Sequence, residues 1–287
     1  PEFLKRFFII LCLVAALVSI IYPTYFYFKF PFPESRLSGY GRLFNPIRAS
    51  SIFGVAFIGC IYLLYRFKSK RVRFFLLCMM VPIFSYVLLA QARGPLMALI
   101  VALVTWKGVL WIKKDRKGSS RFMWIILSGL LAITALIFLL LPDFFYNFFL
   151  ERGFSYRLEM WDQLFGKIKT APVLGLGLSA DTTTLMSDGT KFLHPHSVYV
   201  AALFYGGGVG LLLLLSLIAF SLYQAVIIGK RGERFLVCSL IIFGALCIAT
   251  DGNTLIQHPK PFWLFFWFPI GLAAAVDGGR WPVIGGR

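Results

Sequence analysis

The segment Phe7–Phe28, FFIILCLVAALVSIIYPTYFYF, carries no charged side chain and is long enough to cross a bilayer as a helix, which needs roughly 20 apolar residues. Further apolar runs follow at residues 48–65, 74–91, 95–112, 122–141, 198–228, 235–250 and 261–276. These runs are continuous rather than alternating, which favours helices over barrel strands in lipid. The chain is 59% hydrophobic, with a mean hydropathy of +0.80. We therefore predict an all-α, polytopic membrane protein with about eight transmembrane helices.

The net charge of +17 is concentrated in alternate connections between these runs. Basic residues gather near both chain ends and at residues 66–73, 113–121 and 230–234. Because basic loops stay in the cytoplasm, both termini are predicted to be cytoplasmic and the other loops to face outward. Topology thus accounts for the charge, so no nucleic-acid partner is expected, and attraction to anionic membrane lipids is a secondary effect.

The largest outward-facing connection spans residues 142–197. Its acidic and basic side chains nearly balance. No soluble domain is set apart by composition, so residues 1–287 are predicted to form a single integral membrane domain. The polar residues gather on the outward face, and we expect the chemistry of the protein to lie in the 142–197 loop.

An apolar stripe within this loop recurs at helical spacing and consists of Trp161, Leu164, Phe165 and Ile168. We predict a helix there and expect its stripe to lie in the membrane interface, beside a lipid. The sequence Pro172-Val-Leu-Gly-Leu-Gly follows and is typical of a turn. The polar stretch 179–190 is predicted to be a mobile loop over the site.

The loop ends in His194-Pro195-His196-Ser197, directly before an apolar run. Imidazole moves protons near neutral pH, so a histidine at the mouth of a membrane helix is a candidate acid or base. A His-X-His pair can also be half of a zinc site, which Asp181 or Asp188 would have to complete. A purely structural role for His196 at the helix mouth is the third interpretation.

The glycine-rich segment Gly206-Gly207-Gly208-Val209-Gly210 lies inside the run 198–228. It lacks the following Lys-Ser/Thr of a phosphate-binding loop, so close packing between helices is the predicted reason for these glycines. The run is longer than one crossing requires. It is predicted either to tilt strongly or to begin as a helix outside the bilayer.

Several arginines on the outward face run against the positive-inside bias. Arg42 and Arg48 lie in the first outward loop, and Arg93 stands in Gln91-Ala-Arg-Gly-Pro, at the start of a span. One interpretation is that Arg93 anchors the helix in the headgroup region. The other is that its guanidinium fork holds an anionic group.

Taken together, these motifs resemble the O-antigen ligase family, which also includes O-antigen polymerases and bacterial protein O-oligosaccharyltransferases. The resemblance rests on Gln91-Ala-Arg-Gly-Pro-Leu, on Tyr156-Arg-Leu-Glu-Met-Trp with Pro172-Val-Leu-Gly-Leu-Gly, and on His196-Ser197 followed after nine residues by Gly207-x-x-Gly210. It covers about residues 40–275. Family members have roughly a dozen spans, so the resemblance implies that about four N-terminal spans precede this sequence.

This resemblance implies a GT-C-like glycosyltransferase architecture and a reaction. The reaction is transfer of a glycan, with inversion and without metal or cofactor, from undecaprenyl diphosphate to an acceptor hydroxyl. It is expected at the periplasmic face of the bacterial inner membrane. The expected acceptor is the lipid A–core oligosaccharide, in lipopolysaccharide biosynthesis. A growing glycan, as in a polymerase, and a protein are the alternative acceptors.

The family's essential residues correspond by motif to Arg93, Arg157 and His196. The two arginines are expected to neutralise the diphosphate leaving group. His196 is expected to act as general base, or to bind the diphosphate as imidazolium. Further substrate-binding positions are expected at Arg42, Arg48, His194, Trp161 and Ser197.

A membrane transporter or flippase is the alternative from a different class. Transporters place charged residues near the middle of the bilayer, in broken helices and often in repeated halves. Here the interiors of the predicted spans hold almost no charge, and the polar residues gather on one face. This distribution favours an enzyme that works at that face.

Overall fold

The computed structural model describes residues 2–32, 34–112, 156–228, 230–252 and 260–276, together with residues 129, 132 and 139. The regular secondary structure of these residues is helical apart from one short hairpin, which confirms the predicted all-α class. The predicted span at 122–141 lies outside the described residues, except for three positions.

The helices of the bundle are α1 (Glu2–Lys29), α2 (Pro46–Arg66), α3 (Lys70–Leu89), α4 (Arg93–Ile112), α8 (Val198–Ile227) and α9 (Arg231–Thr250). A π-helix, η2 (Trp263–Trp267), continues into α10 (Phe268–Ala274), and a short η1 (Gly41–Leu43) precedes α2. Among the described helices, α1, α2, α3, α8 and α9 are long and apolar enough to cross a membrane. The apolar stretch Arg93–Trp106 of α4 and the apolar helix Trp263–Ala274 are shorter. The protein is therefore a polytopic helical membrane protein.

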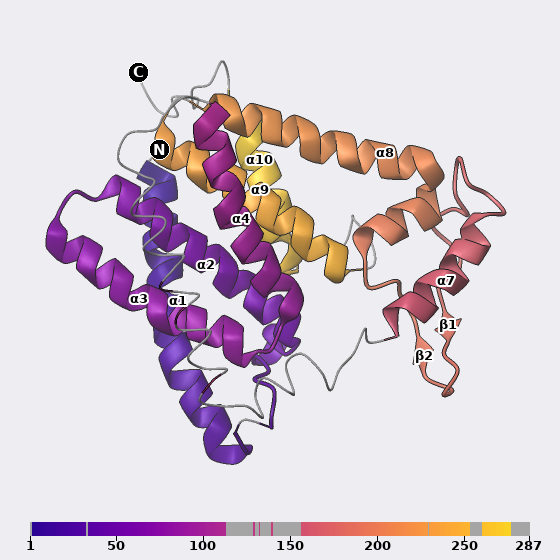
Figure 1. Cartoon of the computed structure of the whole chain (residues 1–287), viewed down its shortest axis with the longest axis horizontal. Coiled ribbons are helices and arrows are strands. Elements are labelled where there is room, and N and C mark those ends of the chain that lie inside the picture. The colour runs from indigo at the N-terminus through magenta and orange to yellow at the C-terminus, as the bar shows by residue number, and fades with distance from the viewer. Residues whose placement is uncertain are drawn as a thin grey trace.

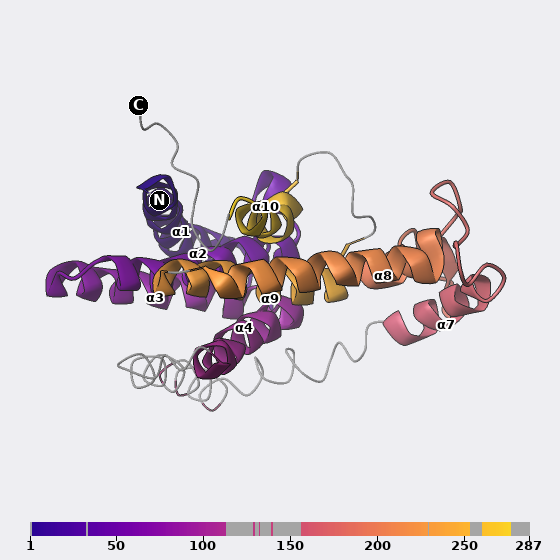
Figure 2. The ribbon, with the colours of Figure 1, turned by 90° about the horizontal axis from the view of Figure 1, so that it is seen from above.

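The bundle has three layers. Figure 2 shows α3, α8 and α9 in a central layer, with α1 and α10 on one side of it and α4 on the other. Successive helices alternate in direction, so the basic loops meet at one end, where Arg66 pairs with the buried Glu233 at 3.7 Å. We call this the basic end. The opposite end, here the distal end, is formed by the starts of α2, α4 and α8 and by the end of α9.

Helix α8 is broken at Gly207, which has φ 61° and ψ −158°. The segment Pro172–Gly177 lies against the break and hydrogen-bonds to its backbone. Leu176 N and Gly177 N donate to the carbonyls of Phe204 and Tyr205 at 2.9 and 3.0 Å. These bonds satisfy carbonyls that a continuous helix would have paired with its own amides. The long run 198–228 is thus divided into a short distal segment and a membrane-spanning segment.

This arrangement corrects the prediction for the glycine-rich segment. A Cβ at Gly207 would overlap the carbonyl of Val173, and a Cβ at Gly175 would overlap that of Tyr205. Gly207 therefore allows two backbone segments to touch, rather than two helices to pack. Gly207 is also needed because its positive φ, combined with this ψ, is a conformation that glycine adopts at little cost.

We expect Gly207→Ala to destabilise the folded protein by about 1–3 kcal/mol, from backbone strain and the clash with Val173. The control is Gly206→Ala, because a Cβ there would meet nothing within 4 Å. Thermal unfolding of the purified full-length protein in detergent measures both. Equal unfolding temperatures for the two variants would contradict this account of the break.

The part of the 142–197 loop that the structure describes forms a small layer on the distal segment of α8 (Figure 1). It contains α7 (Arg157–Ile168) and a hairpin of β1 (Thr184–Leu185) and β2 (Lys191–Phe192). The predicted helix is confirmed. The stretch expected to be a mobile loop instead contains the hairpin turn and hydrogen-bonds to α7, where Ser187 N donates to Glu159 at 2.7 Å.

The apolar stripe of α7 faces protein rather than lipid. Leu164 and Ile168 are buried with Val200 and Phe204 of α8, in one small core. The expectation that the stripe lies in the membrane interface is therefore wrong for these two positions. Phe165 is 41% exposed. An amphipathic stripe requires an apolar partner, and here α8 supplies it.

Candidate active site

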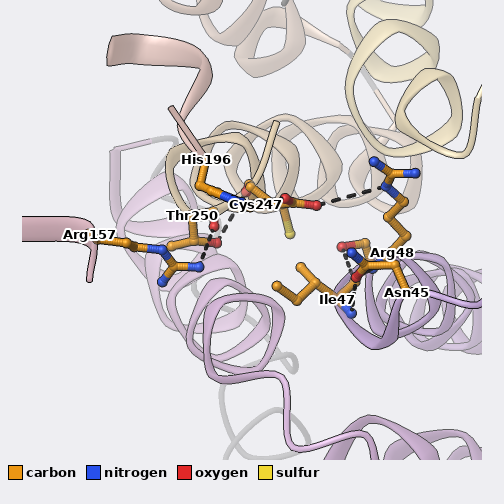
Figure 3. Close-up of polar contacts among 9 residues, drawn as sticks. Asn45, Ile47, Arg48, Arg157, His196, Cys247 and Thr250 are labelled. Atoms are coloured by element: carbon orange, nitrogen blue, oxygen red, sulfur yellow. Dashed lines mark hydrogen bonds and ion pairs between the residues drawn. The ribbon is translucent and has the colours of Figure 1, made fainter. Parts of the chain in front are cut away.

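The polar residues of the distal end converge on the last residues of α9. Figure 3 shows Arg157, His196 and Arg48 approaching the Thr250 end of this helix from different elements. Arg157 begins α7, His196 lies just before α8, and Arg48 lies in the first turn of α2. Five elements thus build one site, because Arg93 at the start of α4 also lies beside this helix end.

Arg48 is positioned by a strong helix start. Asn45 caps α2, accepting from Ile47 N at 2.8 Å and from Arg48 N at 3.4 Å, and Pro46 occupies the first helical position. Both residue types are preferred at these positions. The cap fixes the first turn of α2, from which the Arg48 side chain reaches Asp251.

Asp251 follows α9 and is the centre of the charged contacts. Its Oδ1 lies 3.7 Å from Nδ1 of His196, and its Oδ2 lies 4.0 Å from Nε of Arg48. The Asp251 side chain is 15% exposed. Burial raises the pKa of this carboxyl, but His196 and the charge of Arg48 outweigh burial and hold the pKa below its usual value. Asp251 is therefore an anion at neutral pH.

Arg157 is held by the carboxyl end of α9. Its Nη2 donates to the Thr250 carbonyl at 2.8 Å, a favourable place for a cation because helix carbonyls leave partial negative charge there. Burial lowers the pKa of the Arg157 guanidinium, Asp251 opposes that effect, and the charge of Arg93 adds to it. A guanidinium is protonated in proteins regardless, so two positive charges share this end of α9.

Arg93 reaches the site because α4 begins very close to α9. A Cβ at Gly94 would overlap the Thr250 hydroxyl, so the glycine beside Arg93 allows the two helix ends to touch. The sequence Arg93-Gly94-Pro95 thus has a clear structural basis: the glycine permits the contact and the proline favours a helix start.

His196 has φ 52°, which is uncommon for a residue other than glycine. Its ring contacts the edge of Phe192, with centroids 5.7 Å apart, and the ring of His194, with centroids 4.1 Å apart. Burial lowers the pKa of His194, and the neighbouring His196 adds to that effect. Both effects favour the neutral form of the His194 imidazole.

Trp161 holds the segment His194–His196 by a hydrogen bond. Its indole Nε1 donates to the carbonyl of Pro195 at 2.8 Å, between the two histidines. Ser197 caps α8, with its hydroxyl accepting from Val200 N at 3.4 Å, and it is buried. Both residues therefore hold the histidine loop in place, and their expected contact with substrate is a proposal.

Arg42 is exposed on η1, and no contact among the described residues joins it to the other site residues. Asp188 accepts from the Tyr156 hydroxyl at 2.6 Å, rather than joining the histidines. Among the described residues there is no group of three or more His, Cys, Asp or Glu that could hold a metal ion.

Asp251 is the candidate site residue that the sequence did not reveal. The available signal was a carboxylate followed by Gly252 at the outward end of the predicted span 235–250. Like His196, Asp251 is a polar group at the mouth of a membrane helix. Its pairing with His196 and Arg48 arises from tertiary structure.

The fold and this cluster define a polytopic membrane protein with a strongly cationic, histidine-containing site at the distal end of its helices. Residues 78–215 match the family described as O-antigen ligase, a range that includes Arg93, Arg157 and His196. The chain is 30% identical over 242 residues to an O-antigen ligase of Pseudomonas aeruginosa, which covers 84% of this chain and 57% of the relative. The chain thus spans little more than half the length of that relative. The two matches support membership of the O-antigen ligase family.

Proposed function

We propose that the site transfers a glycan from undecaprenyl diphosphate to an acceptor hydroxyl, at the periplasmic face of the inner membrane. The observation that carries this proposal is the convergence of Arg93, Arg157 and His196 with Asp251 at one end of α9. The site combines positive charge for a diphosphate with a histidine that can take a proton.

The diphosphate leaving group explains the role of the two arginines. As the glycosidic bond breaks, negative charge grows on the diphosphate oxygens, and preorganised donors stabilise that charge. A guanidinium offers five N–H donors in a rigid fork, and Arg157 uses one nitrogen on the Thr250 carbonyl. Arg157 and Arg93 can therefore bind the diphosphate together, and their mutual repulsion is relieved when the anion arrives.

The acceptor hydroxyl explains the role of His196. A sugar hydroxyl is a weak acid, and a base that removes its proton makes it a better nucleophile. The Asp251 carboxylate beside Nδ1 of His196 favours a proton on that nitrogen, which leaves Nε2 to accept the proton of the hydroxyl. The 3.7 Å separation is longer than a hydrogen bond, so in this state Asp251 acts mainly through its charge.

Attack of the acceptor oxygen on the anomeric carbon, opposite the diphosphate, forms the new glycosidic bond and inverts the configuration. His196 retains the proton, and the undecaprenyl diphosphate leaves on the arginines. Each of these steps is assigned to a residue of this chain. Such a mechanism requires no metal ion or cofactor.

The acceptor is proposed to be lipid A–core oligosaccharide, which makes the protein a ligase of lipopolysaccharide biosynthesis. The test supplies the full-length protein in liposomes with labelled undecaprenyl diphosphate–glycan and each candidate acceptor in turn. Label on lipid A–core supports the proposal. Label on a longer glycan or on protein would change the acceptor but keep the chemistry, whereas movement of label across the membrane without transfer would replace the enzyme by a transporter.

The role of Asp251 has its own test. We expect Asp251→Asn to lower kcat about 10- to 150-fold, which corresponds to loss of about 1.5–3 kcal/mol from a charged contact. Asp162→Asn removes an exposed carboxylate of α7 and is the matched control. A kcat equal to that of the wild type would make Asp251 a structural residue.

A further inference from the structure

The segment after α7 exposes apolar side chains that the proposed reaction does not use. Val173, Leu174 and Leu178 are 64%, 74% and 86% exposed. Residues 171–180 contain no charged side chain, and the exposed Lys169 precedes them. Such a group of apolar residues next to a lysine is typical of a segment that enters a membrane interface.

Backbone hydrogen bonds fix this segment against α8. Gly208 N donates to the Pro172 carbonyl at 2.8 Å, and Val209 N donates to the Val173 carbonyl at 3.2 Å. Figure 1 shows the connection from α7 running beside the distal part of α8. The segment therefore adjoins the turn at which the membrane-spanning part of α8 begins.

That part of α8 continues the apolar surface. Val209, Leu212 and Leu213 are 43%, 64% and 65% exposed, on a helix apolar enough to cross a membrane. These are the side chains that acyl chains cover. The exposed residues of the Pro172–Leu178 segment thus extend a lipid-facing surface toward the distal end of the helix.

We propose that the Pro172–Leu178 segment inserts into the lipid interface at the distal end and anchors the α7 layer to the membrane. Removing apolar side chains of this size from water is favourable, so each of them favours lipid over water. The Lys169 ammonium then lies at the level of the lipid phosphates. Three side chains are too few for a stable protein interface, which buries roughly 1,200 Å² or more.

The anchor has a consequence for the site. The same segment is bonded to Phe204 and Tyr205 of α8, and α7 packs on Val200 and Phe204. Its depth in the membrane therefore sets the height of Arg157 above the lipid. The membrane contact itself does not depend on the proposed reaction, so the two can fail separately.

The test measures the depth of spin labels in liposomes. Leu174→Cys and Leu178→Cys are compared with Leu185→Cys on β1 and Leu193→Cys just after β2, two leucines that are also exposed. The background carries Cys78→Ser, because the other free cysteines, Cys12, Cys60, Cys238 and Cys247, are buried. At each site we measure how often the spin label collides with molecular oxygen, which partitions into lipid, and with a nickel chelate, which stays in water.

Labels at positions 174 and 178 are expected to favour oxygen, and labels at 185 and 193 to favour nickel. Equal access of nickel to all four sites would overturn the proposal. So would labels at 174 and 178 that neither reagent reaches, because protein would then cover the segment. Dipolar broadening between identical labels would assign the surface to a second copy of the chain, and would also overturn it.

Discussion

Replacing His196 is expected to lower the rate of glycan transfer about 10²- to 10⁴-fold, the usual contribution of a positioned general base. The acceptor hydroxyl would then have to lose its proton to water. His196→Asn is the more informative replacement, because asparagine tolerates the positive φ of 52° at this position better than alanine does. Transfer kinetics of the full-length protein in liposomes, at matched protein amounts, measure the loss.

The same position separates the two roles proposed for the imidazole. A lysine supplies positive charge but little free base at neutral pH, because its ordinary pKa is about 10.4. His196→Lys is expected to be as inactive as His196→Asn if the residue is the base. Activity of the lysine variant near that of wild type would show that His196 binds the diphosphate instead. Normal transfer by both variants would show that His196 takes no part in the reaction.

Loss of either site arginine is the second large expected effect. Arg157→Ala is expected to lower kcat about 10²- to 10³-fold, the range found when one preorganised donor to a developing oxyanion is removed. Arg93→Ala is expected to fall in the same range. Because the two act on one diphosphate, the double variant should lose less than the product of the single losses.

The controls for the arginines separate charge from geometry. Arg157→Lys keeps the charge but cannot present a planar fork, so it is expected to recover only part of the activity. Lys191→Ala removes an exposed positive charge from β2 and is expected to transfer normally. A loss at Lys191 equal to that at Arg157 would mean that general positive charge, rather than this site, attracts the donor.

The helices were predictable because lipid imposes a strong local rule. Each of the apolar runs that falls on described residues coincides with a helix, since a helix satisfies its own backbone in the absence of water. The break in α8 was not predictable in the same way. Three consecutive glycines permit both a helix contact and a positive φ, and the position of the Pro172–Gly177 segment decides between them.

Some residues of the candidate site could likewise be predicted from the sequence, and others could not. Arg93, Arg157 and His196 stand in motifs that could be recognised in the sequence, and the structure brings all three to the end of α9. Asp251 is a single carboxylate after a span, and its importance comes from contacts made across the fold. The stripe of α7 shows the same limit, because helical spacing reveals an apolar face without identifying the surface that covers it.

The most direct test of the account is glycan transfer in liposomes that contain the full-length protein, undecaprenyl diphosphate–glycan, lipid A–core and EDTA. The account predicts glycan-bearing lipid A–core from the wild-type protein, and almost none from His196→Asn or Arg157→Ala at equal membrane insertion. Product that forms equally in wild type and both variants, or that forms in none of them with any acceptor, would contradict it.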